Sequence, residues 1–188
     1  VTVSEGSLDE LDRWYSIYQE TARRDRIGIH SLSYYRGLLR SSREYHGTAP
    51  DVKLLLAWHE GELLAGNIVA FWRTRAAYLY GASSGVKRNL MPTYALQWEA
   101  IRRAHAAGCL TYDLYGVPPR PDQDHAMFGL YQFKTGFSDK VLARWGTWDA
   151  SFRPVLFALY RAAEALRMFY YRGVKKRLRG RPTRGADT

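Results

Sequence analysis

Three apolar segments that follow one another closely between residues 52 and 84 constrain the fold most. The first two, VKLLLAWH and ELLAGNIVAFW, are separated by Glu60 and Gly61, a pair typical of a tight hairpin turn. The third, AAYLYGASS, begins almost directly after the second. Connections this short leave no room for crossover helices, so the three segments predict an antiparallel meander.

Helical patterns precede the meander. Ser7 and Glu10 have capping-box spacing, which predicts a helix over Leu8–Arg24 with Ser7 as its N-cap. A second helix is expected after Ser31, over Leu32–Glu44, with Gly47 beyond its end.

The remaining pattern predicts a crossover and a return to the sheet. A helix is expected from Pro92 until Gly108, followed by the strand TYDLYG, a short helix that carries Lys134, and a last strand, VLARWGTWDA. This order predicts an α+β fold in which the crossover helix brings a strand beside the meander. It is also the order of a GNAT-like acyltransferase fold, with a central, mostly antiparallel sheet flanked by helices.

Residues 1–150 are expected to form this GNAT-like domain, and residues 151–188 a basic C-terminal helix and tail. The segment from Arg153 onwards has ten Lys or Arg residues against Glu164 and Asp187, in a chain of net charge +10. Such a segment attracts polyanions, either nucleic acid or an anionic membrane surface. For Lys175–Arg184, a solvated tail is an equally good interpretation.

Composition excludes several classes of protein. No apolar run approaches the roughly 20 residues that span a bilayer, and no signal peptide precedes the first segment, so we expect a soluble, cytoplasmic protein. The basic tail also allows peripheral attachment at the inner face of the membrane. Cys109 is the single cysteine, and the five histidines lack metal-ligand spacing, so neither a disulfide nor a metal site is expected.

The segment between the third strand and the crossover helix bears on cofactor use. An enzyme that binds acyl-CoA needs a glycine-rich turn there, because bare backbone amides must contact the pyrophosphate. Here Gly85 is the only glycine, and Leu90, Met91 and Pro92 occupy the remaining space. An acyl-CoA donor is therefore disfavoured, although an acyl-CoA N-acyltransferase stays open as an alternative, and no cofactor is expected.

The same region satisfies the pattern G-x-S-x-G, with Ser83 at the position of a nucleophile. Asp113 and His125 follow in the order that a hydrolase needs. A nucleophile elbow requires a helix directly after the serine, however, and a charged loop intervenes here. A hydrolase is accordingly the weaker interpretation.

Several side chains are candidates for a site. Lys134, after Phe133 on the expected short helix, could keep its stem in an apolar wall and present its ammonium to an oxyanion or a phosphate. Tyr78 and Tyr80 alternate along a strand and are expected to share one face. Asp113 and Tyr115 are also expected to share a face, and an acidic residue in an apolar strand needs a partner or a function. An exposed lysine and core tyrosines are the competing interpretations.

The run YDLYGVPP followed by DHAMFGLYQFKTGF closely resembles the signature of the FemABX peptidoglycan aminoacyltransferases. The upstream residues agree with this resemblance, namely Thr21 and Arg24 as T-x-x-R, the pair Tyr34 and Tyr35, and the AAYLYGASS strand. The likeness spans most of residues 8–149.

The resemblance implies a tRNA-dependent aminoacyltransferase of peptidoglycan biosynthesis, which contributes to cell wall biogenesis and cell shape. It would transfer an amino acid from aminoacyl-tRNA to an amine of a lipid-linked or nucleotide-linked precursor. Lys134 falls on the family's functional lysine, and Tyr80, Tyr78 and Arg24 fall on positions that resemble substrate-binding residues, with which we group Asp113, Tyr115 and Phe133.

Family members commonly have two GNAT-like domains, and this chain resembles the second. A partner domain is therefore expected. A non-catalytic domain that binds RNA or a membrane through its tail is the alternative.

Overall fold

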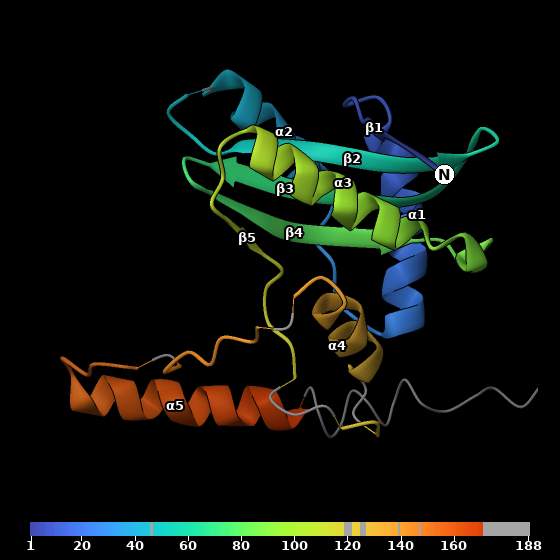
Figure 1. Ribbon diagram of the computed structural model, residues 1–188. Helices are drawn as coiled ribbons and strands as arrows, with labels where there is room; N and C mark the ends of the chain where they lie inside the picture. Colours follow the sequence, from blue (N-terminus) through green and yellow to red (C-terminus); the bar gives the residue numbers. More distant parts are fainter. Residues whose placement is uncertain (46, 119–121, 125–126, 139, 147, 171–188) are drawn as a thin grey trace, which may run out of the picture. The chain divides into compact units, whose positions relative to one another are not determined.

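The computed structural model describes residues 1–45, 47–118, 122–124, 127–138, 140–146 and 148–170 (Figure 1). Residues 1–141 form one unit, and a second unit begins at Leu142. The first unit contains β1 (Thr2–Glu5), α1 (Leu11–Asp25), α2 (Leu32–Glu44), β2 (Asp51–His59), β3 (Glu62–Trp72), β4 (Arg75–Ser83), the short 3-10 helix η1 (Arg88–Leu90), α3 (Pro92–Ala106), β5 (Thr111–Asp113) and α4 (Phe128–Thr135). The second contains α5 (Pro154–Phe169).

One five-stranded sheet, in the order β1-β2-β3-β4-β5, forms the centre of the first unit. Strands β1 to β4 pair antiparallel, which confirms the predicted meander. β5 pairs parallel to β4 after the α3 crossover, and this pairing joins only Arg75–Ala77 to Thr111–Asp113. Beyond Ala77 the two strands no longer pair, and the second half of β4 has no strand partner on this side.

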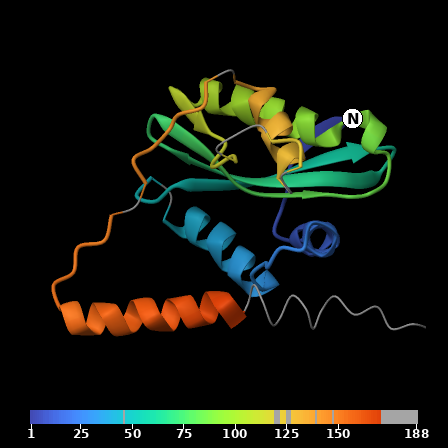
Figure 2. The same ribbon diagram turned by 90° about the horizontal axis from the view of Figure 1, so that it is seen from below.

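Helices cover both faces of the sheet (Figures 1 and 2). α1 and α2 lie on one face and α3 on the other. Successive leucines of β2 alternate between two cores: Leu54 and Leu56 pack with Trp14 of α1, whereas Leu55 packs with Leu96 of α3. A strand with apolar neighbours on both faces reads as a continuous apolar run, and β2 shows this pattern.

A β-bulge in β4 changes which side chains share a face. Ile68 pairs with Tyr80 and the next residue, Val69, pairs with Tyr78, so Leu79 is the extra residue. Tyr80 and Leu79 pack on the α1 and α2 side, whereas Ala76, two residues before Tyr78, packs on the α3 side. The prediction that Tyr78 and Tyr80 share one face is therefore wrong, because strict alternation ends at the bulge.

Other predictions from the sequence meet mixed outcomes. α2 spans the predicted residues, and Gly47 follows it with φ of 85°. Ser7 is not the N-cap of the first helix: α1 begins at Leu11 after Glu10, whose carboxylate accepts a hydrogen bond from the Ser7 amide at 2.8 Å. That bond is one half of a capping box, which explains why the spacing suggested one.

The strands at the sheet edges were harder to predict. β1 was not expected, and β5 ends at Asp113, three residues before the end of the predicted strand TYDLYG. The predicted last strand, VLARWGTWDA, is wrong: its described residues 141–146 and 148–150 form no strand. A strand requires a partner edge, and aromatic or β-branched content alone does not supply one.

Among its described residues, the second unit has an irregular segment and the sixteen-residue helix α5. Within the part of the chain that the structure describes, no helix is both long and apolar enough to cross a membrane. The basic residues predicted to form a tail, from residue 171 onwards, lie outside the described ranges.

Candidate functional site around Lys134

Lys134 lies in the last turn of α4 and is almost fully buried, with 7% of its surface exposed. Its Nζ atom donates a hydrogen bond to the carbonyl oxygen of Gly116 at 2.9 Å. The competing interpretation from sequence, an exposed helix lysine, is therefore wrong. A buried ammonium needs polar partners, and here the loop after β5 supplies one.

Two opposing effects act on the Lys134 ammonium. Burial lowers the pKa of Lys134 below its ordinary value, because desolvation disfavours the charged form. The nearby carboxylate of Asp113 acts in the opposite direction and raises that pKa. Lys134 is thus a desolvated cation next to an anion at the end of β5, where electrostatic interactions are stronger than in water.

The residues after β5 fold back on themselves. A carboxylate oxygen of Asp113 accepts a hydrogen bond from the Tyr115 amide at 2.7 Å, and Tyr115 has φ of 61°. This left-handed conformation is uncommon for a residue with a bulky side chain, and the bond to Asp113 stabilises the turn. Gly116 follows this turn directly, and its carbonyl oxygen accepts the hydrogen bond from Lys134.

Aromatic side chains hold α4 against the first turn of α3. The rings of Phe133 and Phe137 lie 5.0 Å and 5.5 Å from the ring of Tyr94, and 5.6 Å from each other. Edge-to-face contacts of this kind add to the energy of burying the rings. Phe133 therefore supports the helix that carries Lys134.

Tyr80 faces a second aromatic group, on the α1 and α2 side of the sheet. Its hydroxyl lies 3.1 Å from the hydroxyl of Tyr34, and its ring lies 5.1 Å from that of Tyr35. Burial and the hydrogen bond with Tyr34 raise the pKa of Tyr80 above its ordinary value, and Tyr115 contributes electrostatically. Tyr80 is thus a member of the aromatic group formed with Tyr34 and Tyr35.

Tyr78 lies with polar partners beneath α3. It interacts with Gln97 of α3, whose side-chain oxygen also accepts a hydrogen bond from the hydroxyl of Tyr112 at 2.7 Å. Burial raises the pKa of Tyr78 to about 12. Tyr78 is therefore a partly buried residue on the α3 side of the sheet.

Thr21 and Arg24 hold the end of β4. The Thr21 hydroxyl donates to the Ser83 carbonyl at 3.0 Å and accepts from the Ser83 amide at 2.9 Å. Arg24 donates to the same carbonyl at 3.0 Å and to the Ser83 hydroxyl at 3.2 Å, and it pairs with Asp25. These bonds fix the guanidinium of Arg24 at the open end of the sheet.

The same contacts count against a hydrolase. The Ser83 hydroxyl is bonded by a guanidinium, which cannot act as a general base. No α-helix begins directly after Ser83, since α3 starts at Pro92. His125, the third residue of that interpretation, lies outside the described residues.

The turn between β4 and α3 has backbone amides that are already bonded. Glu20 accepts from the Gly85 amide at 2.7 Å, and the Ser84 hydroxyl accepts from the Val86 amide at 3.2 Å. The Leu90 and Met91 amides donate within η1. The Glu20 carboxylate, which binds the Gly85 amide, would also repel a phosphate. The turn is therefore poorly suited to a CoA pyrophosphate.

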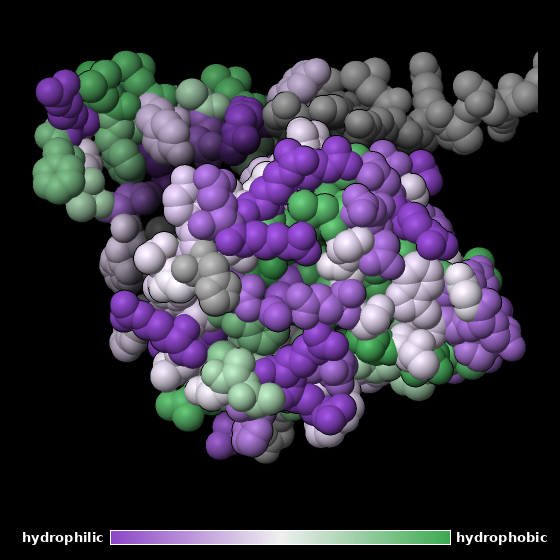
Figure 3. Space-filling view, turned by 90° about the horizontal axis from the view of Figure 1, so that it is seen from above, coloured by the Kyte–Doolittle hydropathy of each residue, from purple (hydrophilic) through white to green (hydrophobic). Residues whose placement is uncertain are grey.

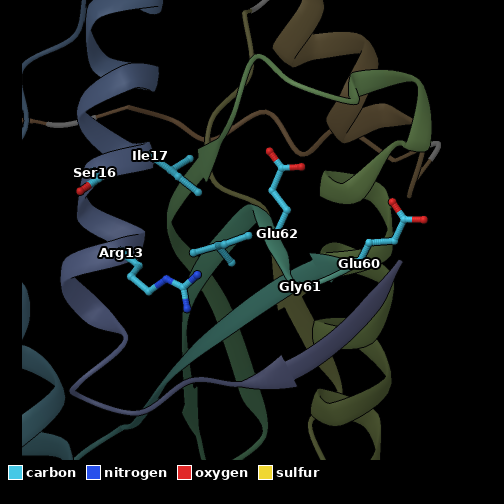
Figure 4. A pocket seen from close by; sticks show the side chains of 7 residues that line it. Arg13, Ser16, Ile17, Glu60, Gly61 and Glu62 are labelled. Atoms are coloured by element: carbon cyan, nitrogen blue, oxygen red, sulfur yellow. The ribbon is translucent and has the colours of Figure 1, made fainter.

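A shallow depression lies between α1 and the β2–β3 turn (Figure 4). Arg13 and Ile17 point towards it from α1, and Glu60 and Glu62 line its other side. Both carboxylates pair with Lys87, at 3.4 Å and 3.1 Å. This depression shares no residue with the Lys134 site. Among the described residues, no cluster of His, Cys, Asp or Glu could hold a metal ion.

Comparison with known proteins decides the family. Residues 53–165, well over half of the chain, match the model of the FemAB family. The chain belongs to the FemAB family. It is 34% identical over 110 residues to a lipid II:glycine glycyltransferase of Staphylococcus haemolyticus, and 32% identical to that of Staphylococcus aureus. Each match covers 58% of this chain and 26% of the relative, so this FemAB chain spans about a quarter of their length.

Solved structures agree with the fold. A crystal structure titled FemX has a TM-score of 0.63 at 20% identity, over 71% of this chain and 48% of FemX. A putative acetyltransferase from Agrobacterium tumefaciens has a TM-score of 0.59 at 13% identity, over 80% of this chain and its own whole length. These likenesses confirm the GNAT-like α+β fold of this FemAB protein.

Sequence reasoning missed some residues around the site. Glu20 and Gln97 both lie on helices with ordinary amphipathic patterns, and each contacts residues 15 or more positions away in the chain. Gln97 was detectable only as a polar residue beside buried Leu96, and Glu20 gave no signal at all. The sequence did find Lys134, Asp113 and Tyr115, which the structure brings together.

Proposed function

We propose that this FemAB domain transfers an amino acid from an aminoacyl-tRNA to an amine of a peptidoglycan precursor stem peptide. The observation that carries the proposal is the buried ammonium of Lys134, next to Asp113 and bonded to Gly116 at the end of β5. A preorganised, desolvated cation is the group that an acyl transfer needs where negative charge develops.

The reaction requires no cofactor. The uncharged amine attacks the carbonyl carbon of the aminoacyl ester, and a C–N bond forms. The ester C–O bond then breaks, and the ribose oxygen of the tRNA leaves with the proton that the amine loses. Lys134 has three N–H donors, of which Gly116 accepts one, so the same ammonium can stabilise the oxyanion of the tetrahedral intermediate.

The relatives suggest the substrates. Both staphylococcal proteins are named for glycyl transfer to lipid II, so we propose lipid II as the acceptor and glycine as the transferred residue. Arg24, held by Ser83 at the end of β4, and Tyr80, in the second half of β4, are proposed to contact the precursor. Because a lipid-linked acceptor lies at a membrane, the proposed location is the cytoplasmic face of that membrane.

A second GNAT-like domain is part of the proposal. The matched region is about a quarter of each curated relative and about half of FemX. The remaining part of each of those proteins has no counterpart in this chain. Precursor contacts shared between two such domains would explain why the loop after β5 opens away from the sheet.

An acyl-CoA donor is less well supported. Some structural neighbours are acetyltransferases, but the amides of Gly85 and Val86 already donate to Glu20 and Ser84. Titration with acetyl-CoA in a calorimeter checks this point, and binding at micromolar concentrations would favour the acyl-CoA alternative.

The transfer reaction tests the proposal directly. Incubation with glycyl-tRNA and lipid II should lengthen the stem peptide by the mass of glycine, measured by mass spectrometry. Lys134→Met should reduce the rate by about a hundredfold or more, the effect of removing one oxyanion donor. Lys140→Met makes the same change at an exposed lysine and should leave the rate unchanged.

Two results would contradict the proposal. An unchanged rate in Lys134→Met would remove this lysine from the mechanism. Salt-sensitive RNA binding without any transfer would favour the alternative of a non-catalytic domain.

A further inference from the structure

Large apolar side chains are exposed throughout the C-terminal unit. Trp145 and Trp148 lie in the segment before α5, and the Trp145 side chain is 93% exposed. α5 itself has no buried residue. Figure 3 shows apolar side chains gathered along this helix, with hydrophilic ones beside them. Exposed apolar groups of this size mark an interaction surface.

One side of α5 carries apolar side chains and no charged one. Val155, Leu159 and Leu166 are spaced by four and seven positions, which places them on one face, and Leu166 is 70% exposed. Arg161 and Glu164 lie on the opposite side, which also carries Phe157 and Met168. An uncharged apolar face opposite the charged side chains is found in helices that lie in a membrane interface.

The length of α5 favours lying on a bilayer over crossing it. Sixteen residues rise about 24 Å, which is short of the roughly 30 Å hydrocarbon core, and the helix carries three charged side chains. The aromatic residues fit the same geometry, because Trp and Tyr favour the boundary between lipid and water.

Charge indicates which membrane. From Arg153 to the end of the chain there are ten Lys or Arg residues against two acidic ones. Arg153, Arg161 and Arg167 lie at or within α5, and the others follow it in sequence. Each basic residue near an anionic surface contributes favourable binding energy, so the excess complements acidic phospholipid headgroups.

We propose that α5 and the tryptophan segment before it, residues 145–146 and 148–169, dock on the surface of an anionic membrane. The apolar face of Val155, Leu159 and Leu166 enters the boundary between headgroups and acyl chains, and the arginines contact lipid phosphates. A nucleic acid would use the same positive charge but gain nothing from that apolar face. This inference goes beyond the proposed transfer reaction, because the docking requires neither tRNA nor lipid II.

Vesicle binding tests the docking. The protein should co-sediment with vesicles of phosphatidylglycerol and phosphatidylcholine and bind phosphatidylcholine alone at least about tenfold more weakly. Tryptophan emission should shift to shorter wavelength on binding, and the shift should shrink in Trp145→Phe/Trp148→Phe. Raising the salt concentration should weaken the binding.

A matched pair of variants separates the two faces of α5. Leu166→Glu places a carboxylate on the apolar face and should weaken vesicle binding by about tenfold or more. Met168→Glu introduces the same charge two residues later, about 200° around the helix, and should have a much smaller effect. Circular dichroism of both variants checks that α5 remains helical.

Three results would overturn the docking. The first is no binding to the anionic vesicles, and the second is equal loss in the two variants. The third is unchanged vesicle binding in Leu166→Glu together with salt-sensitive RNA binding that displaces the vesicles, which would assign the surface to nucleic acid. A fall in the unfolding temperature of Leu166→Glu with no vesicle binding in the parent protein would mean that α5 packs within the protein.

Discussion

The Nζ atom of Lys134 and the carbonyl oxygen of Gly116 are 2.9 Å apart, although 18 positions separate them in the chain. The bond joins α4 to the loop after β5 and keeps the ammonium away from bulk solvent. Lys134 consequently has a structural role in closing this loop as well as its proposed role in transfer.

Lys134 should give the transfer rate an alkaline limit. Burial lowers its pKa below the ordinary 10.5, so its charge is lost at a lower pH than that of an exposed lysine. Arginine stays charged over the same range. The ratio of the Lys134→Arg rate to the parental rate should therefore rise with pH before pH 10.5 is reached. Taking the ratio cancels the ionisation of the acceptor amine, and a ratio independent of pH would contradict the prediction.

Tyr78 should make the fold sensitive to high pH. Its pKa is raised to about 12 in the folded protein from an ordinary 10.0, so the unfolded chain releases this proton first. The stabilisation is complete below pH 10 and is lost as the pH rises from 10 towards 12, by about 3 kcal/mol for a shift of this size. Urea unfolding should show a steeper alkaline loss in the parent than in Tyr78→Phe. An equal alkaline loss of unfolding free energy in the two proteins would contradict this prediction.

Gly81 should not tolerate a side chain. A Cβ atom at this position would overlap the hydroxyl group of Tyr78. We expect Gly81→Ala to lower the free energy of unfolding by about 1–3 kcal/mol, the usual cost of overpacking. Gly37→Ala, at an open position within α2, should instead be neutral or stabilising by about 0.5–1 kcal/mol. Thermal unfolding of both variants measures the difference, and Tyr78→Phe should partly rescue Gly81→Ala.

Thr21 should contribute to stability through hydrogen bonds rather than bulk. Thr21→Val keeps the size of the side chain but removes both bonds to Ser83. The Ser83 amide is then left unpaired, whereas the Ser83 carbonyl keeps its bond from Arg24. The expected loss is about 1–3 kcal/mol in the free energy of unfolding. Ser16→Val removes an exposed hydroxyl from the same helix and should cost much less. Similar losses in the two variants would show that the bonds to β4 are not what matters.

Arg24 should contribute more to precursor binding than to the stability of the fold. Its guanidinium is held by Ser83 and Asp25, and we expect Arg24→Ala to raise the KM for the precursor about tenfold or more with little change in unfolding temperature. Arg23→Ala removes the same charge from the neighbouring exposed position and should leave that KM nearly unchanged.

The parts of the fold that depend on local sequence were predictable. The turn at Glu60 and Gly61, both with positive φ, follows from the residues themselves, and so do α2 and the α3 crossover. β1 was not predictable, because its four residues form a strand only by pairing with β2. The expected strand after Val141 failed for the same reason in reverse, since it has the composition of a strand but no partner among the described residues.

The site was predictable to the extent that its residues lie in one segment. Asp113, Tyr115 and Lys134 come from a single stretch, and the structure joins them through the Tyr115 turn and the Gly116 carbonyl. The Glu20 bond to Gly85 depends on how α1 crosses the sheet, which no pattern in the sequence specifies. The same is true of the face on which Tyr80 lies.

The extra residue Leu79 determines which side of the sheet each later side chain of β4 faces. From Tyr80 to Ser83, every side chain lies on the opposite side from the one it would occupy in a regular strand, so one inserted position gives the sheet a tyrosine on each side within three residues. Because Leu79 is the residue without a partner on β3, deleting it would remove the bulge and restore regular alternation, with Tyr78 and Tyr80 kept on opposite sides of the sheet.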